Sequence, residues 1–287
     1  MMFLPQLILH ELELLLRTKR VLIFGALYLL VALLIGYGAT KALSVAEQAA
    51  MEGSNLTAEQ VREMAADAAE EHREELLSAV DLDEDALSPA LLDAPIGMGY
   101  FLLSLWFLPG LILLFAYDAI GVNLARRTFC YTTFRAPRWA HVTAKWAALS
   151  LAVAAVVLLG GAIVLGVASS MLTTFPTDVA IRAWVRSSGA LLLYSTAYVA
   201  FGVWCSTLAR APFRVLAIGS VLLFAMDLIR IDAIPLSQYL QHISLSHHRP
   251  ALWATVEGGL GLGVLIYIAF TCAFIGLAAA TFQRRDL

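Results

Sequence analysis

The sequence predicts an all-α membrane protein with six transmembrane helices, an N-terminal interfacial helix and a helical extracytoplasmic insertion between the first two spans. Of the 287 residues, 60% are hydrophobic and only 14% are charged, whereas a water-soluble domain averages roughly 25% charged residues. Six apolar runs approach the roughly 20 residues that a helix needs to cross a bilayer. None shows the period-two alternation of a membrane β-barrel strand. The runs cover residues 21–40, 99–118, 146–172, 184–208, 215–229 and 258–281.

The cations are concentrated in alternate loops. Twelve of the nineteen Lys and Arg residues lie before the first run, after the second, after the fourth and after the sixth. Positively charged loops remain on the cytoplasmic side of a membrane. The distribution therefore predicts that both termini are cytoplasmic, in agreement with an even number of spans.

Residues 1–20 are expected to form an amphipathic helix that lies on the membrane. In "FLPQLILHELELLLRTKR" (residues 3–20), polar residues that include His10, Glu13 and Arg17 recur at steps of three and four, and leucines fill the other positions. Such a stripe is typical of an interfacial helix. The alternative is that this segment is only the frayed start of the first span.

Residues 41–98 form an acidic segment that is unlike the rest of the chain. Fourteen carboxylates and two arginines lie between Glu47 and Asp93. Thr57 and Gln60 have the spacing of a helix capping box, and an apolar stripe follows. We therefore expect one or two amphipathic helices outside the membrane. The "DLDED" sequence at 81–85 lacks the glycine and spacing of a calcium loop, so a solvated acidic face or a contact surface for an extracytoplasmic protein is favoured.

The loop at 119–145 is sharply basic and follows Asp118. Before Pro137, apolar and aromatic side chains alternate with cations, so a short amphipathic helix is expected to end near Ala136. Such a helix suits docking into a partner's groove, although positive loops also contact lipid headgroups without a protein partner. The residues concerned are Arg126, Arg127, Phe129, Phe134, Arg135 and Arg138.

Residues 230–257 contain "IPLSQYLQHISLSHHRPALWATV", which alternates at helical steps between prolines. We expect a short helical hairpin that dips back toward the membrane. His242, His247 and His248 lack the ligand spacing of a zinc site, so no metal is predicted there.

The sequence lacks the motifs of an enzyme. It contains no Gly-x-Ser-x-Gly nucleophile motif, no His-Glu-x-x-His and no phosphate-binding Gly-x-x-x-x-Gly-Lys-Ser/Thr. The ionisable residues near the apolar runs, such as Asp118 and Asp227, lie at their ends, whereas ion-coupled carriers keep such residues at mid-membrane. ATP-driven work therefore requires a second subunit, and neither a cofactor in this chain nor a nucleic-acid partner is expected.

The segment "FAYDAIGVNLARRTFCYTTFRAPRWAHVTAKW" (residues 115–146) resembles the link between the second and third spans of ABC-2 type permeases. Members commonly have Asp-Ala-Ile at the end of span two, as at Asp118, followed by a helix, a Pro-x turn and a lysine that opens span three, here Lys145. The ending "FQRRDL" (282–287) is similar to endings in the same family. The usual Glu-rich stretch is replaced by Val-Asn-Leu-Ala-Arg at 122–126, and the usual glycine before Thr128 is Arg127. Within the family, the chain is similar to permeases of nitrous-oxide-reductase maturation and to drug or peptide exporters.

This resemblance implies a half-transporter in the inner membrane of a prokaryote. Two such chains, or this chain and a relative, would pair in lipid, and each would dock its 119–136 helix on a separate ABC ATP-binding subunit that binds ATP and Mg. The expected coupling residues are those of the basic loop together with Asp118.

An exporter of amphipathic lipids, peptides or drugs is expected. Its substrate cleft would be lined by Trp106, Phe107, Tyr194 and Tyr198, unless these rings face lipid or pack between helices. The alternative function is an energy-transmitting or scaffold component that acts on an extracytoplasmic partner through residues 41–98 and moves no solute.

Overall fold

The computed structural model describes the helical parts of the chain. The described residues are 4–54, 60, 95–120, 137–172, 177–209, 211–228, 242, 244–249, 252 and 261–284. They contain seven helices and no strand, which confirms the all-α prediction. The helices are α1 (Leu4–Arg17), α2 (Arg20–Ser54), α6 (Pro95–Ala116), α9 (Arg138–Met171), α10 (Thr177–Leu208), α11 (Pro212–Leu228) and α14 (Leu262–Gln283).

Five of these helices, namely α2, α6, α9, α10 and α14, are long and apolar enough to cross a membrane. The remaining apolar run, 215–229, corresponds to α11, which has 17 residues. Most of the helices are longer than the apolar runs, because their first or last turns contain polar residues that lie beyond the apolar segment. Thus α2 continues to Ser54, into the segment predicted as an insertion from residue 41. In the same way, α9 begins at Arg138, so the predicted 119–145 loop is already helical over its last residues.

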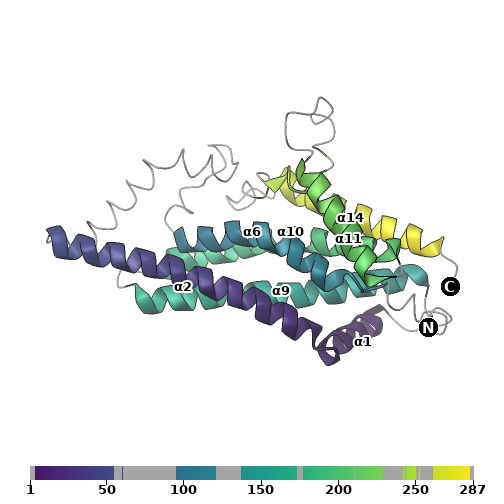
Figure 1. Ribbon diagram of the computed structural model, residues 1–287, viewed down its shortest axis with the longest axis horizontal. Coiled ribbons are helices and arrows are strands. Elements are labelled where there is room, and N and C mark those ends of the chain that lie inside the picture. The colour runs from purple at the N-terminus through teal and green to yellow at the C-terminus, as the bar shows by residue number, and fades with distance from the viewer. Residues whose placement is uncertain are drawn as a thin grey trace.

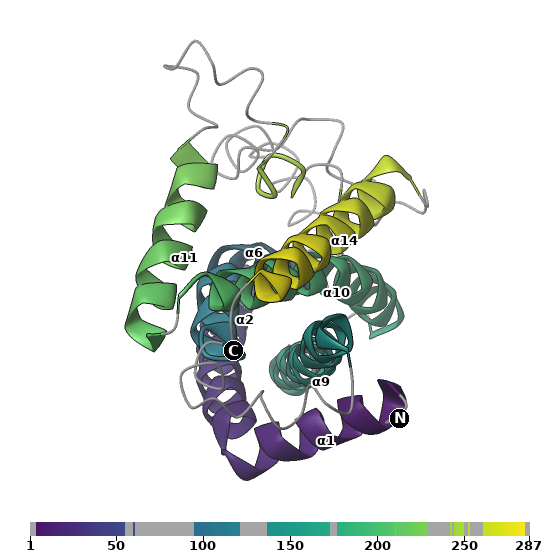
Figure 2. The same cartoon turned by 90° about the vertical axis from the view of Figure 1, so that its right-hand side faces the viewer.

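The spans form a bundle in which α10 is the most buried. Figure 1 shows α2, α6, α9 and α10 running side by side along the long axis of the molecule. Close approach depends on small residues. A Cβ atom at Gly160 of α9 would lie 2.8 Å from the Tyr28 ring of α2, and one at Gly202 of α10 would lie 2.8 Å from the Cβ of Ala116. In contrast, α11 stands at the side of the bundle (Figure 2) and buries only Val215 and Gly219.

A buried polar network joins three of the spans. The Tyr28 hydroxyl on α2 lies 2.8 Å from both the Tyr100 hydroxyl and the Ser104 Oγ on α6. Tyr100 in turn donates a hydrogen bond of 2.7 Å to the carbonyl of Val157 on α9. Polar groups in lipid need hydrogen-bond partners within the protein, and each hydroxyl in this network has one.

The first helix crosses the end of the bundle, at an angle to the spans (Figures 1 and 2). It ends at Arg17, and Lys19 adopts a positive φ of 56° before α2 begins at Arg20. This left-handed residue changes the chain direction. The predicted helix over 1–20 is therefore shorter, and Arg20 belongs to the first span. Leu7 packs against Ala140 and Ala144 of α9, which holds α1 against the bundle.

Both chain termini lie at this end, which we call the terminal end (Figure 1). It contains α1, the starts of α2 and α9, and the last turns of α6 and α14. At the opposite end, α2 projects beyond the other helices (Figure 1). The extension follows from its length, because 35 residues at 1.5 Å per residue span about 50 Å.

Candidate functional site

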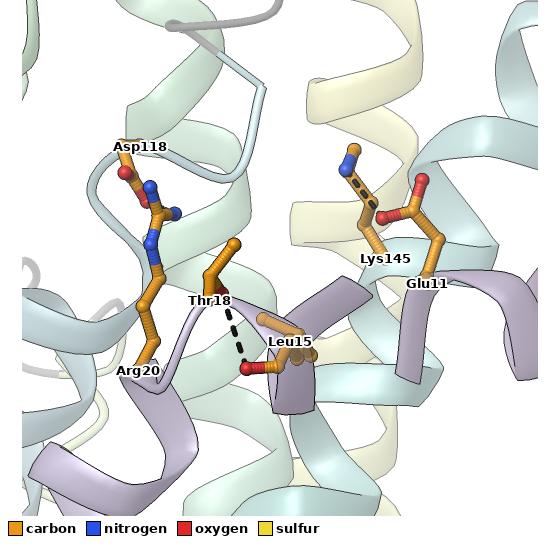
Figure 3. A network of polar contacts seen from close by, with 6 residues as sticks. All are labelled: Glu11, Leu15, Thr18, Arg20, Asp118 and Lys145. Carbon is orange, nitrogen blue, oxygen red and sulfur yellow. Dashed lines mark hydrogen bonds and ion pairs between the residues drawn. The ribbon is translucent and has the colours of Figure 1, made fainter. Parts of the chain in front are cut away.

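A buried ion pair joins α1 to α9 at the terminal end. Lys145 Nζ donates to Glu11 Oε2 at 2.6 Å, and the two side chains are only 6% and 12% exposed. Figure 3 shows the two groups pointing toward one another across the interface of the two helices. A charge removed from water is tolerated when it is paired. This contact therefore fixes both the position and the rotation of α1 on α9.

A second ion pair joins α2 to the turn after α6. Arg20 Nη1 donates to Asp118 Oδ1 at 2.5 Å, and Figure 3 shows them beside the α1–α2 junction. The Asp118 side chain is buried, whereas that of Arg20 is 41% exposed. Burial raises the pKa of the Asp118 carboxyl above 3.8, although the positive charges of Arg20 and Lys145 oppose the shift. Lys145 thus forms an ion pair with Glu11 of α1 and also acts electrostatically on Asp118, in the turn after α6.

Arg138 links the start of α9 to the end of α14. Its Nη1 donates to the carbonyls of Phe282 at 3.2 Å and Gln283 at 2.8 Å, and its guanidinium carbon lies 5.8 Å from the centre of the Phe282 ring. The last carbonyls of a helix have no partner within it and carry partial negative charge, so a cation is favourable there.

These contacts join five helices, α1, α2, α6, α9 and α14, at one end of the molecule. Because α9 carries both Arg138 and Lys145, a displacement of α1 reaches the third span directly and the last span through Arg138. The arrangement is suited to mechanical transmission. It holds no group of three His, Cys, Asp or Glu side chains that could bind a metal, and this is true of all the described residues.

The predicted coupling residues fall in two groups. Asp118 and Arg138 lie within the terminal end, as described above. Arg126, Arg127, Phe129, Phe134 and Arg135 lie outside the described residues. On α1, His10 is exposed, and Glu13 and Arg17 form an i,i+4 ion pair, with Arg17 Nη2 at 2.6 Å from Glu13 Oε1. These three side chains face away from α9.

Sequence reasoning missed Glu11 and its pairing with Lys145. A signal was present, because Glu11 lies outside the polar stripe of His10, Glu13 and Arg17 and on the side of Leu7. A lone carboxylate on the apolar side of an amphipathic helix needs a buried cation. The sequence alone does not identify that cation, since Lys145 is 134 positions away.

The four residues predicted to line a substrate cleft do not share one environment. Trp106 and Phe107 on α6 are 66% and 49% exposed, whereas Tyr194 and Tyr198 on α10 are buried. The two tyrosine rings are 4.6 Å apart, and the Tyr194 hydroxyl donates to the carbonyl of Leu105 at 2.9 Å. The tyrosines thus pack between helices, and the α6 pair faces outward.

The described residues of the segment before α14 pack against the bundle. Leu245 and Leu252 are fully buried in the main core, and the Tyr267 hydroxyl donates to the Leu245 carbonyl at 2.8 Å. Most of this segment lies outside the described residues. The rings of His242, His247 and His248 are 5.1 to 6.4 Å apart, and His248 Nε2 lies 3.0 Å from the carbonyl of His242.

This packing places Arg249 among residues of the spans. Its guanidinium carbon lies 5.4 Å from the centre of the Trp106 ring, and the Tyr194 hydroxyl lies close enough to act on it electrostatically. Arg249 lies within the 230–257 segment that was expected to dip back toward the membrane, but the sequence did not indicate which residues of the spans it would contact.

Comparison with known families gives one match. The sequence model of the family described as "ABC-2 family transporter protein" matches residues 6–287, which is almost the whole chain. A search of curated proteins finds no match.

Proposed function

The chain belongs to the ABC-2 transporter family, and we propose that it is the permease subunit of an ABC exporter of amphipathic lipids, peptides or drug-like molecules. Members of this family are the membrane subunits of their transporters, and the ATP-binding subunit is normally a separate protein. In this proposal ATP and Mg bind to that partner. This chain supplies the path through the membrane and the surface that receives the motion.

The observation that carries the proposal is the buried Glu11–Lys145 pair between α1 and α9. An ATPase that moves α1 would move the third span with it, because separating the pair leaves two charges without partners. Arg20–Asp118 and Arg138 extend the same connection to α2, α6 and α14. The basic loop at 119–136, which begins beside Asp118, would be the second contact with the ATPase.

The membrane arrangement follows from this assignment. We propose that α11 is a sixth span, since 17 residues reach the lower limit for crossing a bilayer. The terminal end would be cytoplasmic, in the inner membrane of a prokaryote, and α1 would lie at the membrane surface. Two permeases, identical or related, would pair in lipid. The exposed apolar side chains of α2 and α11, such as Leu22, Ile23 and Phe224, suit lipid or a second permease.

The first test is co-purification. The tagged chain, expressed with the ATP-binding protein that its genomic neighbourhood encodes, is extracted in mild detergent, and the stoichiometry and ATPase activity are measured. We expect an equimolar complex whose ATPase is stimulated by an amphipathic drug. Charge reversal of Arg126 and Arg127 to Glu should uncouple hydrolysis from transport.

The matched control for that variant is Arg182→Glu. Arg182 is an exposed arginine near the start of α10, at the end opposite to the termini, where it pairs with Asp178 at 2.8 Å. Its reversal should leave coupling intact. A chain that purifies without an ATPase, or a double reversal with normal coupling, would contradict the proposal.

The projecting end of α2 supports a second candidate function. Because α2 continues to Ser54, beyond the ends of its neighbours (Figure 1), it would present the acidic 41–98 segment well outside the membrane. In this version the chain transmits force to an extracytoplasmic protein and moves no solute. Deletion of residues 50–90 separates the two: an exporter keeps drug-stimulated ATPase activity, whereas a transmitter loses its partner.

A further inference from the structure

Arg249 places a permanent positive charge near the middle of the membrane-spanning bundle. Its guanidinium stacks over Trp106, which lies eleven residues after Pro95 and ten before Ala116 in α6. At 1.5 Å per residue, Trp106 is about 16 Å from the start of that helix. A guanidinium stays charged at any physiological pH. Charged side chains at this depth are costly and are characteristic of substrate or ion pathways.

The described residues leave this charge without a carboxylate partner. Arg249 is absent from the ion pairs within 4.0 Å that they form. Its Nε atom is shielded from water and has no hydrogen-bond acceptor among them. The nearest opposite charge, Asp227 at the end of α11, acts on it only from beyond ion-pair distance and is itself exposed. Within the described part of the chain, part of the hydrogen-bonding capacity of Arg249 is therefore unused.

The groups around Arg249 differ on its two sides. On the inner side lie the buried side chains of Tyr194 and Tyr198, both of which act electrostatically on the arginine. On the outer side lies Trp106, which is 66% exposed, followed by the exposed Phe107. An apolar tail could thus lie along the α6 surface while its polar head reaches the guanidinium.

We propose that Arg249 binds the anionic headgroup of an amphiphile, a phosphate or carboxylate on an apolar tail, and that Tyr194 and Trp106 orient it. This inference rests on the proposed transport function and specifies its substrate class. The guanidinium fork matches the oxygen atoms of such groups. The exposed aromatic pair on α6 favours an amphiphile that arrives from lipid over a free anion that arrives from water.

The test measures binding to the full-length chain purified in dodecyl maltoside. Titration calorimetry compares dodecyl phosphate with dodecyltrimethylammonium, which has the same tail and the opposite charge, and with inorganic phosphate. We expect dodecyl phosphate to bind and the other two to bind at least tenfold more weakly. Arg249→Gln should weaken dodecyl phosphate binding about ten- to a hundredfold, the range for a charge-assisted hydrogen bond.

Two further variants make the result decisive. Arg182→Gln removes an exposed arginine at the start of α10 and should leave binding unchanged. Arg249→Lys keeps the positive charge but loses the planar, two-pronged guanidinium group, so it should retain part of the affinity. This variant replaces Arg249→Gln if the Gln protein does not fold. Equal binding by the unmodified chain and both Arg249 variants would overturn the proposal. Equally tight binding of inorganic phosphate would overturn the assignment to an amphiphile.

The ATPase activity of the complex distinguishes this inference from the proposed function. If no ATP-binding subunit co-purifies, the transporter assignment fails, whatever the calorimetry shows. If the complex forms and hydrolyses ATP but dodecyl phosphate stimulates the Arg249→Gln complex as strongly as the unmodified one, only the Arg249 assignment fails.

Discussion

Lys145 is a buried cation and Arg249 a half-buried one in the same bundle, and their surroundings differ. Lys145, at the terminal end, contacts the Glu11 carboxylate at 2.6 Å, and Asp118 lies within electrostatic range. Arg249, at mid-bundle, has an aromatic ring and a tyrosine hydroxyl as neighbours, and its Nε has no acceptor among the described residues. Among the described residues, a carboxylate neutralises Lys145, and none lies within ion-pair distance of Arg249.

This difference separates a structural charge from one that is available to a ligand. A buried ion pair gains little over a well-packed apolar pair, but it enforces one geometry and is costly to break. Those are the properties that a transmitting joint between α1 and α9 requires. Arg249 has no carboxylate partner among the described residues and so gives no such constraint, which agrees with the proposal that it binds an anionic headgroup.

The largest expected effect comes from breaking the paired cation. Glu11→Ala leaves Lys145 buried and unpaired, so we expect a loss of about 3 to 5 kcal/mol in the free energy of unfolding. The measurement is the thermal unfolding midpoint of the purified chain in detergent.

The matched control is the double variant Glu11→Leu with Lys145→Met, which replaces the ion pair by an apolar one. It should recover most of the lost stability, because neither charge then remains buried alone. A Glu11→Ala protein as stable as the unmodified chain would mean that Lys145 reaches water and that α1 is not held by this pair.

A smaller effect is expected from neutralising the unpaired cation. Arg249→Met removes a charge that has no carboxylate partner among the described residues, while Tyr194 keeps its hydrogen bond to the Leu105 carbonyl. We expect the free energy of unfolding to change by no more than about 1 kcal/mol, in either direction, because no partner charge is left buried alone. The same unfolding measurement applies. A loss as large as that of Glu11→Ala would make Arg249 a structural residue and remove the contrast.

The sequence predicted the helices better than it predicted their connections. Apolar runs of about 20 residues identify spans directly, and Pro137 and Pro212 stand immediately before α9 and at the first position of α11, as the restricted backbone of proline favours. The resemblance of the loop after Asp118 also identified the family. These are local signals that short stretches of sequence carry.

The buried charges could not be assigned from the sequence. Glu11 and Lys145 are 134 positions apart, and Arg20 and Asp118 are 98 apart, so only the packing of helices brings them together. Arg249 lies in a segment of mixed polarity that was expected to dip back toward the membrane, but hydropathy does not reveal which helices its side chains then contact. Local pattern thus located the helices, and tertiary structure decided which polar residues lie between them.

The smallest expected effect concerns Asp118, whose surroundings are intermediate between those of Lys145 and those of Arg249. Its carboxylate is buried like that of Glu11, but its partner Arg20 is 41% exposed, and burial raises its pKa above 3.8 against the attraction of Arg20 and Lys145. Because the pKa of this carboxyl is higher in the folded than in the unfolded protein, its protonation stabilises the fold. This stabilisation is complete at pH values below the unfolded-state pKa, and it is lost as the pH rises through the folded-state pKa.

We therefore expect the stability advantage of the unmodified chain over Asp118→Asn to be greatest near pH 4, to fall as pH rises and to become constant above the folded pKa. At neutral pH the variant should differ by under about 1 kcal/mol, as for partly exposed pairs. Unfolding midpoints of both proteins across this pH range provide the measurement. Arg20→Gln is the control. Without the positive charge of Arg20 the pKa of Asp118 should rise further, so the stability advantage over Asp118→Asn should continue to decrease to a higher pH. An advantage that instead grows with pH would show that the ion pair outweighs burial, and Asp118 would then belong with Lys145 among the paired, structural charges.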